Sequence, residues 1–233
     1  MTTDKAAAGW PTGFGINPRP VLPDPKLVEE FRNVPTALVS DCLGRALGSI
    51  GLKSYHNSFS LGMCGPALTV RTRPGDNLMI HKAIGMAQPG DVIVIDGGGD
   101  ISQALMGGLM RVLAIARKIN GFVIDGAIRD ISEWAEGLIS VYARGHTHRG
   151  PSKDGPGEIN VPICCAGMVV GPGDLVLGDA DGVVSIPVGK LQMLLPLVRA
   201  KAQQEETIRQ ANLTGEFDND RFNLLLRAKG CPV

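Results

Sequence analysis

Two adjacent residues, Arg129 and Asp130, have the clearest chemical potential in this sequence. Arginine presents a planar fork of donors that suits a carboxylate, and aspartate can hold a hard divalent cation through oxygen while water fills the remaining positions. The pair therefore fits an α-keto acid bound together with Mg²⁺ or Mn²⁺. A salt bridge at a helix end would explain an Arg-Asp dipeptide about as well.

A second set of groups comes from the predicted helix that precedes this pair. Its start is open: Ser102 is an available cap, but the pair Gly107-Gly108 weakens a helix running through it, which favours a start near Met106. In the second case the backbone N–H groups of Gly107, Gly108 and Leu109 are free to bind an anion. Apolar residues recur at helical spacing along the helix, at Leu105, Leu109, Val112, Leu113 and Ala116.

These groups must be positioned by a strand, loop, helix, strand unit. Residues 92–95 and 122–124 are unbroken apolar runs, as expected for buried strands, and residues 96–100 form a glycine loop. Return through a helix predicts a parallel, right-handed crossover. Ligands gather beyond the carboxyl ends of such strands, so the glycine loop, Asp125 and the Arg-Asp pair are expected on one rim. Asp125-Gly126 is expected to end the second strand.

The rest of the chain divides into an N-terminal arm with a short helix (1–34), a core (35–187) and a helical extension (188–233). The polar second half of the extension is expected to pack on a neighbouring subunit. Further helices are predicted at 23–32, 36–47, 77–87, 131–137, 188–212 and 221–228. Further strands are predicted at 64–72, 139–143, 158–165, 168–170, 174–177 and 182–186, the last four with hairpin spacing.

Composition limits the class of protein. Basic and acidic residues balance at 23 each and aromatic residues are 4%, which argues against a nucleic-acid partner or an anionic membrane surface. No apolar run reaches the length of a membrane span, and the N-terminus lacks a signal-peptide core. The expected location is the cytoplasm, with reduced thiols at Cys42, Cys64, Cys164, Cys165 and Cys231.

Other polar residues have simpler interpretations. Asp41 is expected to be an exposed carboxylate in the middle of a helix, and His81 a hydrogen-bonded helix residue. His146 and His148 are two residues apart and could chelate a metal from a strand. No third ligand is near in sequence, so a solvated loop is the favoured interpretation.

From about residue 35 to 187 the chain resembles the RraA-like family, which includes class II 4-hydroxy-4-methyl-2-oxoglutarate/4-carboxy-4-hydroxy-2-oxoadipate aldolases and the regulator of ribonuclease activity A. The resemblance is carried, in order, by VSDCLGR, HKAIGMAQPGDVIVIDGGGD, GFVIDGAIRD, EINVPICCAGMVVGPGD and DADGVVSIP. It implies an α/β, three-layer β/β/α, swivelling-domain-like fold with parallel and antiparallel sheets. It also implies homo-oligomers, as trimers or hexamers, with active sites between subunits.

The resemblance assigns roles to individual residues. In such aldolases the aspartate of the Arg-Asp pair, here Asp130, anchors the metal, and the arginine, here Arg129, binds the keto acid. Backbone amides around Gly107 to Leu109 meet the substrate carboxylate. A neighbouring subunit's C-terminal helix can contribute an acid, for which Glu205 and Glu206 are the candidates.

One position departs from the aldolase pattern. An acidic residue is expected twenty-one positions before the arginine, where this chain has Gly108. That acid is implicated in proton transfer, so the aldol base is in question. The candidates to replace it through a water are Asp96, Asp100, Asp125 and Glu158. Oxaloacetate decarboxylation uses the same enolate without a hydroxyl base, so it is expected to survive the change better than aldol cleavage.

The leading hypothesis is thus a metal-dependent lyase that releases pyruvate from a 4-hydroxy-2-oxo diacid, with oxaloacetate decarboxylation as a second activity. The alternatives are a non-catalytic, protein-binding regulator of ribonuclease activity and a metal enzyme with another oxo-acid substrate. A nucleotide-dependent methyltransferase is disfavoured, because the glycine run 97–99 lacks the spacing of a dinucleotide-binding loop.

Overall fold

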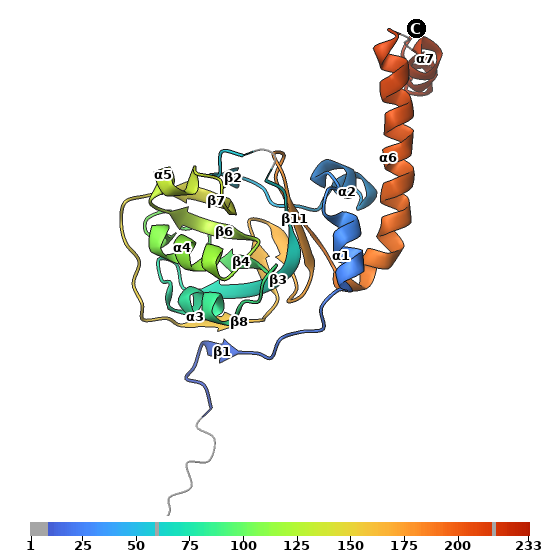
Figure 1. Cartoon of the computed structure of the whole chain (residues 1–233). Helices are drawn as coiled ribbons and strands as arrows, with labels where there is room; N and C mark the ends of the chain where they lie inside the picture. The colour runs from blue at the N-terminus through green and yellow to red at the C-terminus, as the bar shows by residue number, and fades with distance from the viewer. Residues whose placement is uncertain (1–8, 59–60, 216–217) are drawn as a thin grey trace, which may run out of the picture.

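The computed structural model describes residues 9–58, 61–215 and 218–233 (Figure 1). Its main sheet has the strand order β1-β8-β3-β4-β6-β7-β2. Strands β3, β4, β6 and β7 run parallel, which confirms the predicted crossover. These strands are β1 (Phe14–Ile16), β2 (Lys53–Ser54), β3 (Met63–Thr72), β4 (Val92–Asp96), β6 (Gly121–Ile128), β7 (Ser140–His146) and β8 (Gly157–Ile159).

Side chains of the central strands alternate between two cores. In β4, Ile93 and Ile95 point to one face and Val92 and Val94 to the other, as the two-residue period of a strand requires. The isoleucine face packs against α3 (Leu78–Met86), α4 (Gly108–Ala116) and α5 (Ile131–Trp134). The valine face packs against β9 (Ile163–Cys165), β10 (Met168–Val170), β11 (Leu175–Gly178) and β12 (Val183–Ile186), which form antiparallel hairpins. The result is the predicted three-layer β/β/α arrangement.

A third core joins the two ends of the chain. Helices α1 (Pro25–Phe31), α2 (Thr36–Cys42) and α6 (Leu191–Leu213) pack together against β11 and β12, on the side of the sheet away from α4 and α5 (Figure 1). After Val198 the described part of α6 buries no residue, and α7 (Asn219–Ala228) follows it. No helix among the described residues is long and apolar enough to cross a membrane.

The N-terminal arm is tied to the sheet. Residues 1–8 lie outside the described part of the chain, and the arm is not irregular throughout, because β1 pairs in parallel with β8. Arg19 donates two hydrogen bonds to the carboxylate of Asp91, at 2.6 and 2.8 Å. Asp91 is buried, so this ion pair holds the arm against the start of β4.

One open alternative is decided and two local predictions need correction. Helix α4 starts at Gly108, near the favoured start at Met106 and not at Ser102, because Ala104–Met106 forms the short strand β5 beside β6. Asp125-Gly126 does not end β6, which continues to Ile128 past a shift in register. Leu109, Val112 and Leu113 are exposed, and the face of α4 that packs inward carries other residues, including Met110 and Ala114.

Helix α2 is capped from a distant turn. The carboxylate of Asp179 accepts hydrogen bonds from the backbone N–H and the hydroxyl of Thr36, at 2.8 and 2.7 Å. Thr36 is therefore the first residue of the helix, where the predicted helix also begins. We expect Asp179→Ala to lower the free energy of unfolding by about 1–2 kcal/mol, as loss of a cap does. Urea denaturation measures this, with Asp181→Asn in the same turn as the control; equal midpoints for the two variants would contradict it.

Candidate functional site

Arg129 and Asp130 lie in the short connection between β6 and α5, as predicted for the end of a central strand. Asp130 adopts the left-handed conformation, with φ 60° and ψ 45°. Few residues other than glycine adopt it, and such conformations concentrate at functional sites. The Arg129 Nε lies 3.6 Å from Asp130 Oδ2, and both side chains are about 40% exposed, so solutes can reach them.

The carboxylate of Asp130 faces the N-terminus of α4. Its Oδ2 accepts a hydrogen bond of 2.8 Å from the Gly108 N–H. The Gly108 amide is therefore not free, contrary to the prediction, whereas the Leu109 N–H has no partner in the described part of the chain. Oδ1 of Asp130 likewise has no donor among the described residues. Asp130 Oδ1 and the Leu109 N–H are thus both available to a ligand at the start of α4.

Both glycines at the start of α4 lie against side chains of the site. A Cβ on Gly107 would lie 2.5 Å from Asp130 Oδ2 and 2.9 Å from Arg129 Nε. A Cβ on Gly108 would lie 2.2 Å from Oε2 of Glu133, a residue of α5. The pair therefore brings two carboxylates against one helix N-terminus, where negative charge is favoured. Nothing in the sequence indicated that Glu133 belongs to the site, except that it lies three residues after Asp130.

One cavity, of about 170 Å³, opens beside Arg129 and the α4 terminus. Asn77, His81 and Lys153 are polar residues of its wall that sequence analysis did not place at the site. The buried Oδ1 of Asn77 has no hydrogen-bond partner within the described residues, so a ligand donor can satisfy it. Burial and the nearby Lys153 charge lower the pKa of His81, which leaves its imidazole neutral at pH 7.

A second cavity, of about 320 Å³, lies on the other side of the same pair. It is lined by Arg129, Asp130, Ile131, His146, Thr147 and His148. The two histidines thus lie beside Asp130, although they were interpreted as part of a solvated loop; His146 is the last residue of β7. The described residues contain no group of three or more His, Cys, Asp or Glu side chains that could hold a metal. An ion at Asp130 would keep most of its water.

The four acids considered as substitutes at Gly108 are engaged elsewhere. Asp125 is bound by Arg144 at 2.5 Å and by the Ala166 N–H at 2.8 Å. Glu158 pairs with Arg71. Asp96 and Asp100 accept hydrogen bonds from residues of the glycine loop and the turn after it, namely Gly98 and Ser102. None of the four lines either cavity beside Arg129, and neither does Glu133, whose carboxyl group lies against Gly108 at the start of α4.

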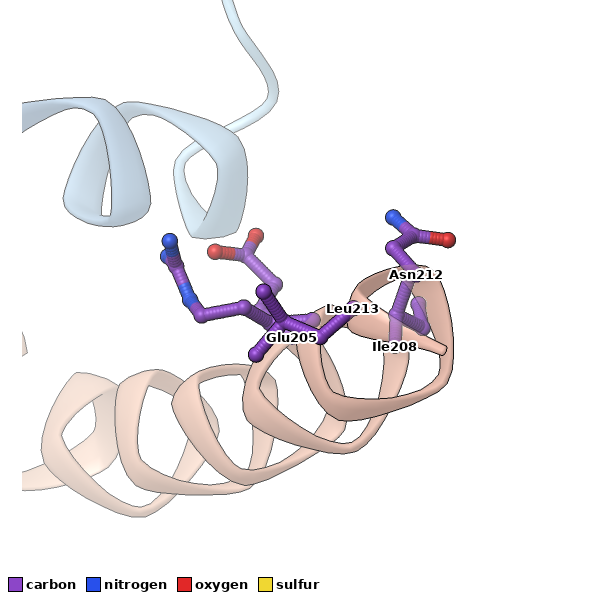
Figure 2. Close-up of a pocket in the computed structure, with 5 residues that line it drawn as sticks. Glu205, Ile208, Asn212 and Leu213 are labelled. Carbon is purple, nitrogen blue, oxygen red and sulfur yellow. The ribbon is translucent and has the colours of Figure 1, made fainter. Parts of the chain in front are cut away.

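Glu205 and Glu206 lie on α6, on the far side of the same chain from α4 and α5 (Figure 1). Glu205 lines an open cavity of about 390 Å³ with Ile208, Arg209, Asn212 and Leu213 (Figure 2). It lies 3.5 Å from Lys201. Within one chain neither glutamate reaches Asp130, so their predicted role requires a second subunit.

Asp76 anchors the loop that carries Lys153. Its side chain is fully buried and accepts hydrogen bonds from the N–H groups of Leu78, Asp154 and Gly155 and from the Ser152 hydroxyl, at 2.7–3.0 Å. Burial alone would raise the pKa of Asp76, but these hydrogen bonds outweigh it and hold the pKa below its usual value. The carboxylate therefore stabilises the fold when ionised.

We expect Asp76→Asn to lower the free energy of unfolding by about 2–4 kcal/mol at pH 7 and to raise KM for a substrate that contacts Lys153. Because the folded pKa is depressed, the wild-type advantage is complete above about pH 4 and shrinks as the pH falls through the folded pKa. Urea titrations at pH 7 and pH 3 measure the difference. The exposed Asp154 of the same loop provides the control, Asp154→Asn; a pH-independent difference would contradict the argument.

The three-layer β/β/α fold agrees with the fold expected from the resemblance to RraA-like proteins. The Aldolase/RraA family model matches residues 36–185, and the chain belongs to this RraA-like family. The resemblance inferred from the sequence is thereby confirmed.

Three relatives illustrate the family. A Halalkalibacterium halodurans protein named "Putative 4-hydroxy-4-methyl-2-oxoglutarate aldolase" is 41% identical over 186 residues, covering 79% of this chain and 87% of its own length. A Thermus thermophilus protein named 4-hydroxy-4-methyl-2-oxoglutarate aldolase is 37% identical over 112 residues, 48% of this chain and 68% of its own. A solved structure titled as the RNA-processing inhibitor RraA from Thermus has a TM-score of 0.60 and 31% identity, covering 66% of this chain and 92% of that one.

Proposed function

We propose that this protein is a class II, divalent-metal-dependent aldolase that releases pyruvate from a 4-hydroxy-2-oxo diacid of the 4-hydroxy-4-methyl-2-oxoglutarate type. The observation that carries the proposal is the convergence of the Arg129 guanidinium, the Asp130 carboxylate and the α4 N-terminus between two cavities. The names of the two aldolase relatives support the same reaction.

The donor set fits Mg²⁺ or Mn²⁺. The Asp130 carboxylate offers the unbonded Oδ1 to the side chain's exposed surroundings. Mg²⁺ commonly binds through one or two carboxylates, keeps several waters and takes further oxygens from the substrate. Asp130 anchors the cation in this proposal, and no cluster of protein ligands is needed.

The substrate is held at both of its carboxylates. Arg129 binds the α-keto acid end through its planar fork, and the free Leu109 N–H and the α4 terminus add donors for the same carboxylate. Lys153, in the wall of the 170 Å³ cavity, binds the distal carboxylate. Two cationic groups in one cavity favour a diacid.

Cleavage removes the proton of the C4 hydroxyl, forms a carbonyl at C4 and breaks the C3–C4 bond. The electron pair of that bond becomes the enolate of pyruvate, which takes up a proton at C3. A divalent cation, when bound, supplies stabilisation of the negative charge that develops on the C2 oxygen. Decarboxylation of oxaloacetate yields the same enolate without a hydroxyl base, so it is the second proposed activity.

The active protein is a homo-oligomer, a trimer or hexamer, in this proposal. The exposed Leu109, Val112 and Leu113 of α4 and the exposed apolar residues of α7 provide surfaces for a neighbouring chain. The extension over 188–233 packs on that neighbour and brings Glu205 or Glu206 to its site. Light scattering with size-exclusion chromatography tests this directly, because a monomer would contradict it.

The decisive assay measures pyruvate release from 4-hydroxy-4-methyl-2-oxoglutarate and from oxaloacetate with Mg²⁺ or Mn²⁺, and again with EDTA. We expect turnover with either metal, at least a hundredfold loss with EDTA, and recovery when the metal is restored. Turnover that persists in EDTA would reject the metal-dependent mechanism. No turnover on either substrate, in folded protein that binds Mn²⁺, would reject the aldolase.

A protein-binding regulator of ribonuclease activity is the second candidate. It is favoured by the likeness to the structure titled as an RNA-processing inhibitor and by the exposed apolar residues of α7. Inhibition of a ribonuclease by the wild type, retained in Asp130→Asn, would favour this function over the aldolase.

A further inference from the structure

We propose that Glu133 supplies the acid–base carboxylate of the aldol reaction, from helix α5. This inference rests on the proposed function. Retro-aldol cleavage needs a group that takes a proton from a hydroxyl and gives one to an enolate carbon, and a carboxylate within reach of the substrate can do both. Arg129 and Lys153 serve the site as hydrogen-bond donors and offer no acceptor for that proton.

The geometry at Gly108 points to Glu133. All three atoms of its carboxyl group lie 2.2–2.4 Å from the position that a Cβ on Gly108 would occupy. Gly108 itself binds Asp130 through its N–H, so the Glu133 carboxylate lies beside the proposed metal anchor and at the terminus that binds the keto acid. Any larger residue at position 108 would displace it. The glycine therefore makes room for this carboxylate.

The backbone at Glu133 is held in place from both sides. The Glu133 N–H donates to the Asp130 carbonyl at 3.0 Å, and the next residue, Trp134, is fully buried. The short helix α5 is thus fixed on both sides of Glu133. Its side chain is partly exposed, which leaves it open to solutes.

The carboxylate of Glu133 is also available for proton transfer. Within the described residues its carboxylate makes no ion pair and no hydrogen bond. The neighbouring Glu136, in contrast, pairs at 2.8 Å with Arg111, whose side chain is only 4% exposed. The acids weighed from the sequence are bonded elsewhere, as described above. Glu133 is the carboxylate of this region, beside Asp130, that remains free to exchange a proton.

Glu133 can carry out both proton transfers of the reaction. Glu133 takes the C4 hydroxyl proton, directly or through one water, as the C3–C4 bond breaks and the electron pair passes to C3 and C2. The protonated Glu133 then returns that proton to C3, which completes pyruvate. No oxidant, reductant or further reactant is consumed, and Glu133 ends as a carboxylate. Oxaloacetate decarboxylation has no hydroxyl proton to remove and does not need the first transfer.

The first test compares Glu133→Gln with wild type in both reactions. We expect kcat for the hydroxy diacid to fall on the order of 100-fold, KM to change less than threefold, and oxaloacetate decarboxylation to fall less than fivefold. Mn²⁺ affinity, measured by electron paramagnetic resonance, should stay within threefold. Glu29→Gln on the distant helix α1 is the control for a lost surface carboxylate, and thermal melts confirm folding.

The second test moves the carboxylate to the opposite helix. Gly108→Asp in the wild-type background should lower activity, because the new side chain meets Glu133. In the Glu133→Ala background, which removes both the carboxylate and the steric conflict, the same change should raise aldol cleavage about tenfold, whereas Gly108→Asn, of equal size, should not. An effect of Gly108→Asp on activity that changes sign between the two backgrounds would show that the two carboxylates occupy the same position. Equal activities of the Asp and Asn double variants would overturn the proposal.

Exchange of the pyruvate C3 protons with D₂O, followed by NMR, gives a readout that needs no aldol substrate. Slowed exchange in Glu133→Gln supports the proposal. If the wild type is active and Glu133→Gln is equally active in cleavage and exchange, the proposed role of Glu133 is rejected. That result would leave the proposed aldolase function standing. A wild type that binds Mn²⁺ but neither cleaves, decarboxylates nor exchanges rejects the proposed function itself.

Discussion

Replacing Asp130 by asparagine is expected to lower kcat/KM for pyruvate release on the order of 10³-fold, with little loss of stability. The carboxylate is the proposed anchor of the cation, and an amide oxygen carries no net charge to hold it. Because the cation would stabilise the negative charge that develops on the enolate oxygen, we expect the loss mainly in kcat. Steady-state kinetics with Mg²⁺ and with Mn²⁺, and a Mn²⁺ binding titration, measure the two effects separately.

Asparagine is the informative substitution because of the backbone at this position. Asp130 has φ 60°, which asparagine tolerates better than alanine does. An amide oxygen can still accept the hydrogen bond from the Gly108 N–H, so α4 keeps its cap. Asp130→Ala would add backbone strain and remove the cap, and its activity loss would not isolate the charge.

The control is Asp181→Asn, which neutralises an exposed aspartate in the turn between β11 and β12. It should match wild type in turnover and metal affinity. The assignment of Asp130 as the anchor fails if Asp130→Asn binds Mn²⁺ as tightly as wild type does, or turns over at the wild-type rate.

The position of the Arg-Asp pair could be predicted because strong local signals surround it. Two unbroken apolar runs, at 92–95 and 122–124, favoured buried strands, and a helix between them favoured a parallel return. The structure places Arg129 and Asp130 where β6 ends, as that reasoning requires. The extent of β6 was missed, since a glycine in a strand can mark an end or an irregularity with equal ease.

The internal geometry of the site could not be predicted in the same way. The bond between Asp130 and the Gly108 N–H joins residues 22 positions apart, and no local pattern encodes it. The direction of the Glu133 side chain depends on α5 being a single turn that Trp134 anchors in the core. His146 was assigned to a loop because β7 ends three residues later than predicted, at His146; His148 lies beyond the end of the strand.

The apolar residues of α4 show a second limit of prediction from sequence, which concerns the surface that covers a hydrophobic face. Periodicity predicted an amphipathic helix, which is present, but Leu109, Val112 and Leu113 face outward. A hydrophobic pattern identifies a face that avoids water and does not say whether its own core or another chain covers it. The inward face, with Gly108 and Ala114 among its buried residues, gave a weaker signal.

Replacing Trp134 by alanine is expected to lower the free energy of unfolding by about 3–5 kcal/mol, the usual cost of removing a large buried aromatic side chain. Trp134 is 0% exposed and packs edge-to-face on Phe122, with ring centroids 6.1 Å apart. Its Nε1–H also donates to the carbonyl of Arg129 at 2.9 Å. The same residue therefore fills the core and holds the proposed substrate-binding arginine.

Trp134→Phe separates these two contributions. Phenylalanine keeps much of the apolar volume but leaves the Arg129 carbonyl without its donor, at a cost of about 1–3 kcal/mol. Urea denaturation gives the stability of both variants, and kinetics at a temperature where both are folded gives KM. We expect Trp134→Phe to raise KM severalfold, because Arg129 is no longer fixed at its backbone. A lowered stability with an unchanged KM would mean that packing alone, and not this hydrogen bond, sets the position of Arg129.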